Sequence, residues 1–100
     1  MNPILLVTGG SRGIGAATAR LAAARGWDVA INYTRDAAAA EAVALDVRAQ
    51  GRRAITLQAD VADEAQVRAM FATLDRDFGP LAGLANNAGV VDQGARFVEM

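Results

Sequence analysis

The sequence predicts an α/β fold in which a doubly wound parallel sheet carries helices on both faces. Three observations predict it: continuous apolar runs recur about every 25 residues, segments with helical periodicity separate them, and a glycine follows each such segment. Continuous apolar runs are typical of strands buried on both faces, and strands that alternate with helices are joined by right-handed crossovers, which make the sheet parallel. The four runs are Ile4–Val7, Val29–Ile31, Ala54–Leu57 and Leu81–Ala85.

The spacing of apolar side chains predicts three helices between these strands. In the first, which begins after Gly13, Ile14, Ala17 and Leu21 share one face. The other two helices also repeat their apolar residues at helical intervals, so each is expected to bury one stripe against the sheet. The stripes are Ala40, Val43, Ala44 and Val47 in the second helix and Val67, Met70, Phe71, Leu74 and Phe78 in the third.

Glycines and one aspartate mark the ends of these helices. Gly26, Gly51 and Gly79 stand where the helices are expected to stop. Asp63, with Gln66 three positions on, is a candidate N-cap for the third helix.

The order of elements predicts strand order 3-2-1-4, the first half of a doubly wound sheet. The fourth strand would then be an exposed apolar edge, which proteins normally avoid. We therefore expect one domain over residues 1–100 that is incomplete and continues beyond Met100; the alternative is that another chain supplies the missing strands.

The composition argues against several classes of function. A formal net charge of −1 provides no basic surface for nucleic acid. With no cysteine and no histidine, disulfides, most zinc and copper sites and histidine-based triads are excluded, so no metal ligand is predicted. The early apolar run is far shorter than the roughly 20 residues needed to span a bilayer, so we expect a cytoplasmic protein without a membrane partner.

A glycine-rich turn from Thr8 to Gly15 joins the first strand to the first helix. Gly9 permits a tight turn, Gly13 lets the backbone approach a pyrophosphate, and Gly15 lets the helix pack close to the sheet. The helix N-terminus offers amide groups and a positive dipole end to phosphate. The alternative is a plain strand-to-helix turn. The candidate cofactor-binding residues of the turn are Gly9, Ser11, Arg12, Gly13, Ile14 and Gly15.

Two further motifs follow later strands, at the carboxyl ends where ligands bind in open parallel sheets. Asp60-Val61 follows the third strand and Asn86-Asn87-Ala88-Gly89 the fourth. Together with the turn Thr8-Gly9-x-x-x-Gly13-Ile14-Gly15, they resemble three signatures of the short-chain dehydrogenases/reductases, in the same order. The resemblance covers essentially the whole chain and implies a Rossmann-like domain that binds a nicotinamide dinucleotide.

The end of the second strand predicts which nucleotide is bound. An acidic side chain there accepts hydrogen bonds from the ribose of NAD and repels the 2′-phosphate of NADP. The family resemblance implies that this position is occupied by Tyr33, which is followed by Thr34 and Arg35. Arg12 and Arg35 can converge on a phosphate, so NADP is favoured over NAD; a solvated surface arginine is the alternative for Arg35.

Two acids near this strand argue against NADP only weakly. Asp28 stands at its other end, and Asp36 is better placed to begin the next helix, where an acid suits the dipole.

The resemblance also implies roles for the two later motifs. Asp60 would bond the adenine amino group and the Val61 backbone would meet the ring, unless Asp60 caps a helix instead. Asn86, Ala88 and Gly89 would line the ribose and the path to the nicotinamide, while Asn87 would tie neighbouring strands together. A plain turn remains the alternative for this segment.

No catalytic residue is predicted within the chain. The family resemblance implies a tyrosine with a lysine four residues later, since a phenol with a pKa near 10 needs a nearby positive charge to act near neutral pH. The position four after Tyr33 is Ala37, and the chain has no lysine. Ser11 belongs to the phosphate turn, so we expect the catalytic part to lie outside the chain.

The predicted function is an NADP(H)-dependent oxidoreductase that interconverts an alcohol and a carbonyl by hydride transfer. Its partners would be a small-molecule substrate and, by resemblance, other copies of itself in a dimer or tetramer. The alternative is a non-catalytic NADP-binding module with a regulatory or scaffolding role. A methyltransferase is disfavoured, because its cofactor commonly requires an acid where Tyr33 stands.

Overall fold

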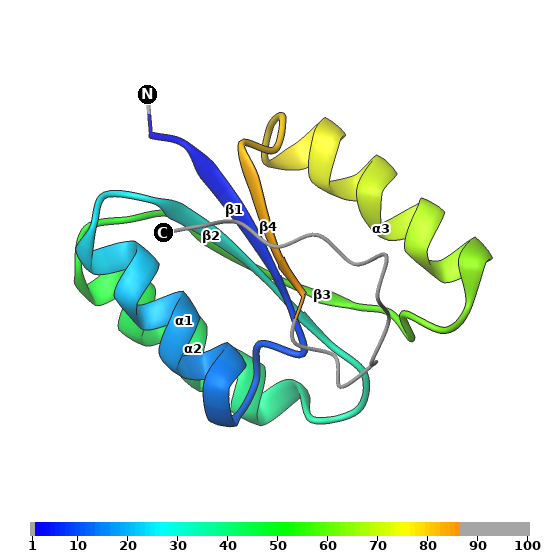
Figure 1. Cartoon of the computed structure of the whole chain (residues 1–100), viewed down its shortest axis with the longest axis horizontal. Coiled ribbons are helices and arrows are strands. Elements are labelled where there is room, and N and C mark those ends of the chain that lie inside the picture. The colour runs from blue at the N-terminus through cyan, green and yellow to red at the C-terminus, as the bar shows by residue number, and fades with distance from the viewer. Residues whose placement is uncertain (1, 87–100) are drawn as a thin grey trace.

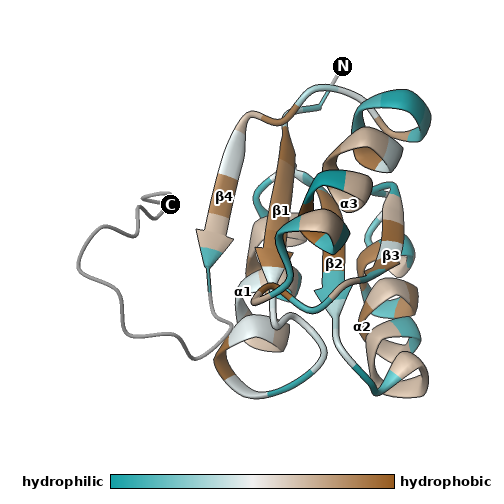
Figure 2. Cartoon of the chain, turned by 90° about the vertical axis from the view of Figure 1, so that its right-hand side faces the viewer, coloured by the Kyte–Doolittle hydropathy of each residue, from teal (hydrophilic) through white to brown (hydrophobic). Residues whose placement is uncertain are grey.

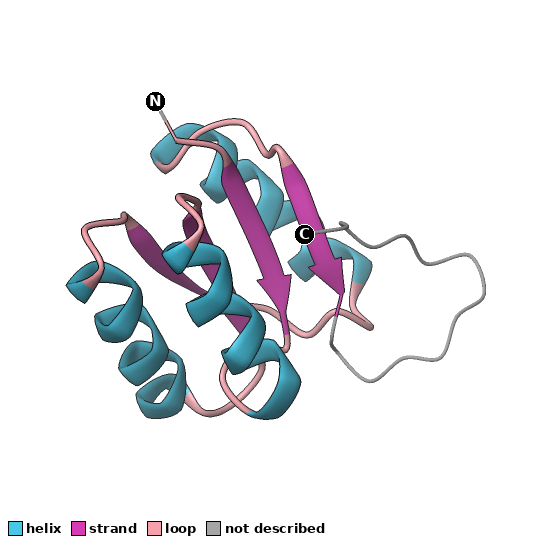
Figure 3. Cartoon of the chain, turned by 60° about the vertical axis from the view of Figure 1, so that its left-hand side comes forward, coloured by secondary structure: helices cyan, strands magenta, loops and turns pink. Residues whose placement is uncertain are grey.

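The structure, a computed structural model, describes residues 2–86 and contains one four-stranded parallel sheet in the order β3-β2-β1-β4. Helices α1 and α2 cover one face of the sheet and α3 covers the other (Figure 1; Figure 3). The predicted fold class and strand order are therefore confirmed. In chain order the elements are β1 Ile4–Thr8, α1 Gly13–Ala24, β2 Asp28–Tyr33, α2 Ala37–Ala49, β3 Ala54–Gln58, α3 Glu64–Asp77 and β4 Gly83–Asn86.

Strand β1 lies at the centre of this sheet and sets its register. Leu6 is paired with Ala30 of β2 on one side and with Leu84 of β4 on the other. Because all the strands are parallel, their carboxyl ends meet at one edge. Hydrophilic residues gather at the tips of β2 and β4 there, whereas β1 is hydrophobic along its length (Figure 2).

The core consists of two layers separated by the sheet. Leu5 and Val7 of β1 face α1 and α2, while Leu6 faces α3. Every residue of β1 is buried, which explains why this strand is a continuous apolar run and does not alternate.

The expectation that all four strands are buried on both faces holds only for β1 and β2. Most residues of β3 and β4 are half-buried, and Gln58 is exposed. Both strands are edges of the sheet formed by residues 2–86, and an edge strand has no neighbour to cover its outer side.

The predicted buried face of α1 is wrong. Ile14 is 76% exposed and Leu21 47% exposed. The side chains that face the sheet are instead small. They repeat at helical intervals like the predicted stripe but lie on another face of the helix. They are Ala16, Ala19, Ala22 and Ala23. Periodicity could not separate the two stripes; in the structure the alanines pack with the buried residues of β1 and β2.

The other helices follow the predictions more closely. The four stripe residues of α2 are buried, and so are Met70 and Leu74 of α3, whereas Phe71 is 38% exposed. The glycines after the helices adopt the left-handed conformation predicted for helix stops, with φ of 97°, 82° and 131° at Gly26, Gly51 and Gly79.

None of the helices within residues 2–86 has the length and apolar character needed to cross a bilayer.

Candidate functional site

The glycine turn leaves the start of α1 without a side-chain cap. Arg12 occupies the N-cap position and makes no side-chain hydrogen bond to the first turn. The other helices of the described region are capped by Asp36 and Asp63. The amide groups at the start of α1, with the positive end of the helix dipole, therefore remain available to an anion.

Two physical reasons favour glycine at Gly9, Gly13 and Gly15 of the turn. Gly9 and Gly13 have φ of 62° and 56°, which favour glycine. A Cβ on Gly13 would meet nothing within 4 Å, so the backbone there borders open space. A Cβ on Gly15 would collide with the Gly9 carbonyl oxygen and lie 2.9 Å from the Gly10 Cα. The close approach predicted for Gly15 is thus made to the turn itself and not to the sheet.

Asn32 is a structural residue of the site that the sequence analysis missed. Its buried side chain accepts a hydrogen bond from the Gly9 amide (3.2 Å) and donates to the carbonyls of Leu57 (3.2 Å) and Ala59 (3.1 Å). Its own carbonyl accepts from the Gly10 amide at 2.9 Å. Asn32 therefore ties the glycine turn to the tips of β2 and β3. A polar residue directly after the apolar run of β2 was the available signal.

A pocket of about 470 Å³ lies at the carboxyl ends of β1, β2 and β3. It brings together most of the predicted cofactor-binding residues, from segments far apart in the sequence. Asp36 and Ala62 also line it and were not predicted to belong to the site. The complete lining is Gly9, Ser11, Arg12, Tyr33, Thr34, Arg35, Asp36, Asp60, Val61 and Ala62.

Asn86 does not line this pocket and lies on the side nearer α3. It borders a cavity of about 270 Å³ together with Thr8, Val61 and residues of α3. Thr8 Oγ1 donates a 2.8 Å hydrogen bond to Asn86 Oδ1. Val61 lines both spaces and so joins them. Ala88 and Gly89, also predicted for the site, lie outside the described residues.

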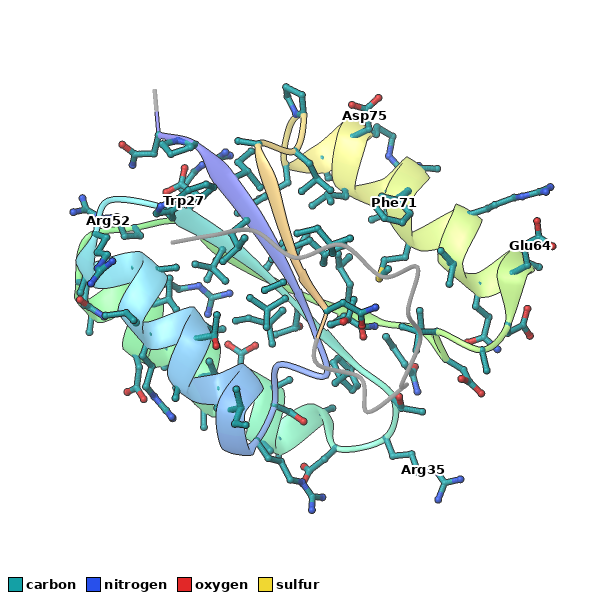
Figure 4. The ribbon with its side chains drawn as sticks, viewed as in Figure 1. Trp27, Arg35, Arg52, Glu64, Phe71 and Asp75 are labelled. Atoms are coloured by element: carbon teal, nitrogen blue, oxygen red, sulfur yellow. The ribbon has the colours of Figure 1, made fainter. Side chains whose placement is uncertain are left out.

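The two arginines of the pocket differ in their surroundings. Arg12 Nη2 lies 3.2 Å from Asp36 Oδ2, and their side chains are 74% and 39% exposed. Arg35 is exposed, and its side chain extends outward from the loop after β2 (Figure 4). Both arginines thus line the pocket, but only Arg12 is held in place by an ion pair, whereas the Arg35 side chain points toward solvent.

The acidic residues near the pocket have defined structural partners. Asp36 Oδ1 accepts a 2.9 Å hydrogen bond from the Ala39 amide, which confirms that Asp36 begins α2. Asp60 Oδ1 accepts from the Ala62 amide at 2.9 Å, so it shapes the loop and does not cap α3. Asp63 caps that helix through the amides of residues 65 and 66, as predicted.

Asp28 lies at the opposite end of β2 from the pocket, as the sequence analysis inferred. Burial raises the pKa of its carboxyl, but hydrogen bonds from the Arg53 amide and guanidinium and from Asn2 lower it more, so the net pKa is below the ordinary value of 3.8. Arg53 also lies over the Phe78 ring, 4.3 Å from its centroid. This cluster stabilises the far end of the sheet and takes no part in the pocket.

Residues 2–86 contain no group of three or more acidic side chains arranged to hold a metal ion.

Comparison with known proteins supports a family assignment. The sequence profile of the family described as short chain dehydrogenase matches residues 3–100. The chain is 52% identical over 88 residues to the uncharacterized oxidoreductase YgfF of Escherichia coli, covering 88% of this chain and 36% of that protein. It is 43% identical over 90 residues to the 3-oxoacyl-[acyl-carrier-protein] reductase FabG of Staphylococcus aureus, covering 90% and 37%.

A solved structure shows the same similarity in three dimensions. A short chain dehydrogenase from Burkholderia cenocepacia in complex with NADP superposes with a TM-score of 0.83 at 52% identity, over 88% of this chain and 36% of that one. The chain thus spans little more than a third of the relatives that it matches. The match of the family profile over nearly all of its residues, on a sheet of the expected order, shows that the chain belongs to the short-chain dehydrogenase family.

Proposed function

We propose that this chain forms the NADP(H)-binding region of an oxidoreductase that interconverts an alcohol and a carbonyl by hydride transfer. The observation that carries the proposal is the pocket at the strand tips. The pocket reaches the uncapped N-terminus of α1 at Arg12, and its lining includes a second arginine, Arg35, and Tyr33 where NAD-binding proteins commonly have an acid. A relative at 52% identity has been solved with NADP bound.

The geometry of the glycine turn fits a dinucleotide diphosphate. The backbone at Gly13 borders open space, and the missing Cβ of Gly15 lets α1 begin directly beside the turn. We assign the diphosphate to the amides of this segment, from Gly9 to Gly15. Ser11 lines the pocket and Ile14 is exposed at the first turn of the helix, so both can contact the cofactor.

The rest of the pocket fits the adenosine half of the cofactor. Arg12 and Arg35 would hold the 2′-phosphate, since guanidinium binds phosphate through paired, charge-assisted hydrogen bonds. Tyr33 and Thr34 would border the ribose. The Asp60 carboxylate keeps Oδ2 available for the adenine amino group while Oδ1 bonds Ala62, and the Val61 backbone would meet the ring.

The nicotinamide half would continue past Asn86, and contacts with Ala88 and Gly89, which lie outside the described residues, stay a prediction. When bound, the nicotinamide supplies a hydride donor or acceptor at its C4 position. The residues of this chain bind and orient the cofactor, and we assign none of them to proton transfer. A tyrosine and a lysine four residues after it remain a prediction for sequence beyond residue 100.

Titration of the full-length protein with NADPH and NADH tests cofactor choice. We expect NADPH to bind more tightly, and Arg12→Gln with Arg35→Gln to weaken NADPH by roughly tenfold, because charge-assisted hydrogen bonds are worth about 1.5–3 kcal/mol and exposure reduces this. NADH affinity should change much less. Arg20→Gln, which alters an exposed arginine paired with Asp46 outside the pocket, is the matched control.

Equal affinity for the two nucleotides, or an NADPH affinity that ignores both arginines, would contradict the cofactor proposal. Turnover is tested separately, by following NADPH oxidation with a panel of ketones and aldehydes. Tight binding without any oxidation would argue against an enzyme and for a binding module. Assembly into dimers or tetramers stays a prediction, which light scattering on the full-length protein can check.

A further inference from the structure

Asp36 divides its two carboxylate oxygens between two tasks. Oδ1 accepts a 2.9 Å hydrogen bond from the Ala39 amide and so caps α2. Oδ2 accepts a 3.2 Å hydrogen bond from Arg12 Nη2 across the wall of the cofactor pocket. Both oxygens are thus engaged, one with the fold and one with a guanidinium that lines the site.

The cap fixes where the second oxygen lies. A carboxylate anchored at a helix N-terminus by an amide hydrogen bond and the helix dipole cannot swing away from the pocket without giving up that anchor. Asp36 therefore stays beside Arg12 when an anion enters. An incoming phosphate must either displace the carboxylate from Arg12 or share the guanidinium with it.

Because the Arg12–Asp36 pair is exposed, a phosphate can displace the Asp36 carboxylate from Arg12. Arg12 and Asp36 have side chains that are 74% and 39% exposed, and ion pairs with such exposure contribute little free energy. The charged groups that line this pocket are Arg12, Arg35, Asp36 and Asp60, two of each sign. Asp36 thus cancels part of the positive charge available to a phosphate.

We propose that Asp36 is a specificity-determining residue, which moderates the preference of the site for a 2′-phosphate over a 2′-hydroxyl by competing for Arg12. This inference rests on the proposed function, because it assumes that the pocket holds NADP(H). It adds that the strength of the preference is set at the N-cap of α2, in addition to the strand tip at Tyr33. Without the competing carboxylate, Arg12 would be fully available to the phosphate.

Asp36→Asn separates the two tasks of the residue. Asparagine is as good an N-cap as aspartate, so its Oδ1 can keep the Ala39 bond, while its amide group cannot accept from Arg12. We expect the ratio of NADPH to NADH affinity in the full-length protein to rise roughly two- to fivefold, the range that an exposed ion pair supports. The increase should shrink at high salt.

Asp46→Asn is the matched control. Asp46 lies in α2, the helix that Asp36 caps, and pairs with Arg20 at 2.7 Å, outside the pocket. Its replacement by asparagine makes the same change in net charge. The affinity ratio of this variant should equal that of the unmodified protein. An equal rise in both variants would show that only net charge matters and would overturn the inference.

The role of Arg12 is tested by repeating Asp36→Asn in an Arg12→Gln background. If Asp36 acts by holding Arg12, the change in the affinity ratio should largely disappear there. A change of undiminished size would mean that Asp36 repels the phosphate directly, and it would overturn the proposed competition. An unchanged ratio for Asp36→Asn in the original background would overturn it as well.

Failure of this inference can be told apart from failure of the proposed function. Unmodified protein that binds NADPH tightly and depends on Arg12 and Arg35, but ignores Asp36→Asn, would refute the inference alone. Unmodified protein that does not bind NADPH would refute the proposed function itself. Thermal unfolding of Asp36→Asn in the absence of nucleotide, expected to match the unmodified protein, shows that the cap has survived.

Discussion

Replacement of Asn32 by leucine should destabilise the protein far more than the loss of one exposed polar side chain would. Leucine has the same number of side-chain heavy atoms as asparagine, branches at the same carbon and is bulkier, so the change removes hydrogen bonds without opening a cavity. Asn32 is 1% exposed, and leucine would leave the Gly9 amide and the carbonyls of Leu57 and Ala59 without these bonds.

The magnitude follows from counting those groups. Each buried polar group that loses its partner costs about 1–3 kcal/mol, and carbonyls that keep another partner fall at the low end. We therefore expect Asn32→Leu to lower the free energy of unfolding by about 3–5 kcal/mol, which is a large share of the roughly 5–15 kcal/mol typical of a domain.

Urea unfolding of the full-length protein, followed by circular dichroism, measures the effect as a shift in the transition midpoint. Gln58→Leu is the matched control, because it also removes an amide that donates to a carbonyl, that of Thr34 at 3.2 Å, but from an exposed position. It should cost less than about 1 kcal/mol. If Asn32→Leu were no more harmful than this control, our account of how the turn is held would be refuted.

Three further predictions concern the turn, the far end of the sheet and the third helix. Gly15→Ala should lower the thermal midpoint well below that of Gly13→Ala, because a Cβ on Gly15 meets backbone whereas one on Gly13 meets open space and costs only the roughly 1–2 kcal/mol of a left-handed residue; similar midpoints would contradict this. Asp28→Asn should cost about 1–3 kcal/mol at pH 7. The folded pKa of Asp28 lies below 3.8, so the contribution of its carboxylate to stability is complete above that pH and is lost as the pH falls through the folded value. The difference in free energy of unfolding between Asp28→Asn and the unmodified protein should therefore be smaller at pH 3 than at pH 7. Asp63→Ala should cost about 1 kcal/mol through loss of the cap and Asp63→Asn almost nothing; equal losses, measured by urea unfolding, would rule out capping as the cause.

The sequence was sufficient to predict the fold because each signal was local and strong. Apolar runs, helical spacing and glycine stops follow from backbone geometry, and parallel topology follows from their alternation. The buried stripe of α1 was mispredicted because Ile14, Ala17 and Leu21 have the same spacing as the alanines that face the sheet. The stripes differ in which of them the helix turns toward the sheet, and a periodic pattern alone does not give that orientation.

The candidate site was predictable in its parts and less so in its connections. Motifs at the strand tips indicated most of the residues that line the pocket. Asn32 was missed because its partners are backbone groups of other strands, which have no signature in sequence. The pairing of Arg12 with Asp36 was missed because it joins positions 24 residues apart that only the crossover brings together.

The alanine surface of α1 has a consequence for substitutions far from the nucleotide. Ala19 and Ala23 are fully buried, so a larger side chain at either position would have no space and would lift the helix from the strands. Because α1 is a single rigid helix, a shift of its middle also shifts its first turn. That turn contains the amides assigned to the diphosphate. A methyl group added at the middle of the helix would thus weaken nucleotide binding by displacing these amides, without touching any atom of the ligand.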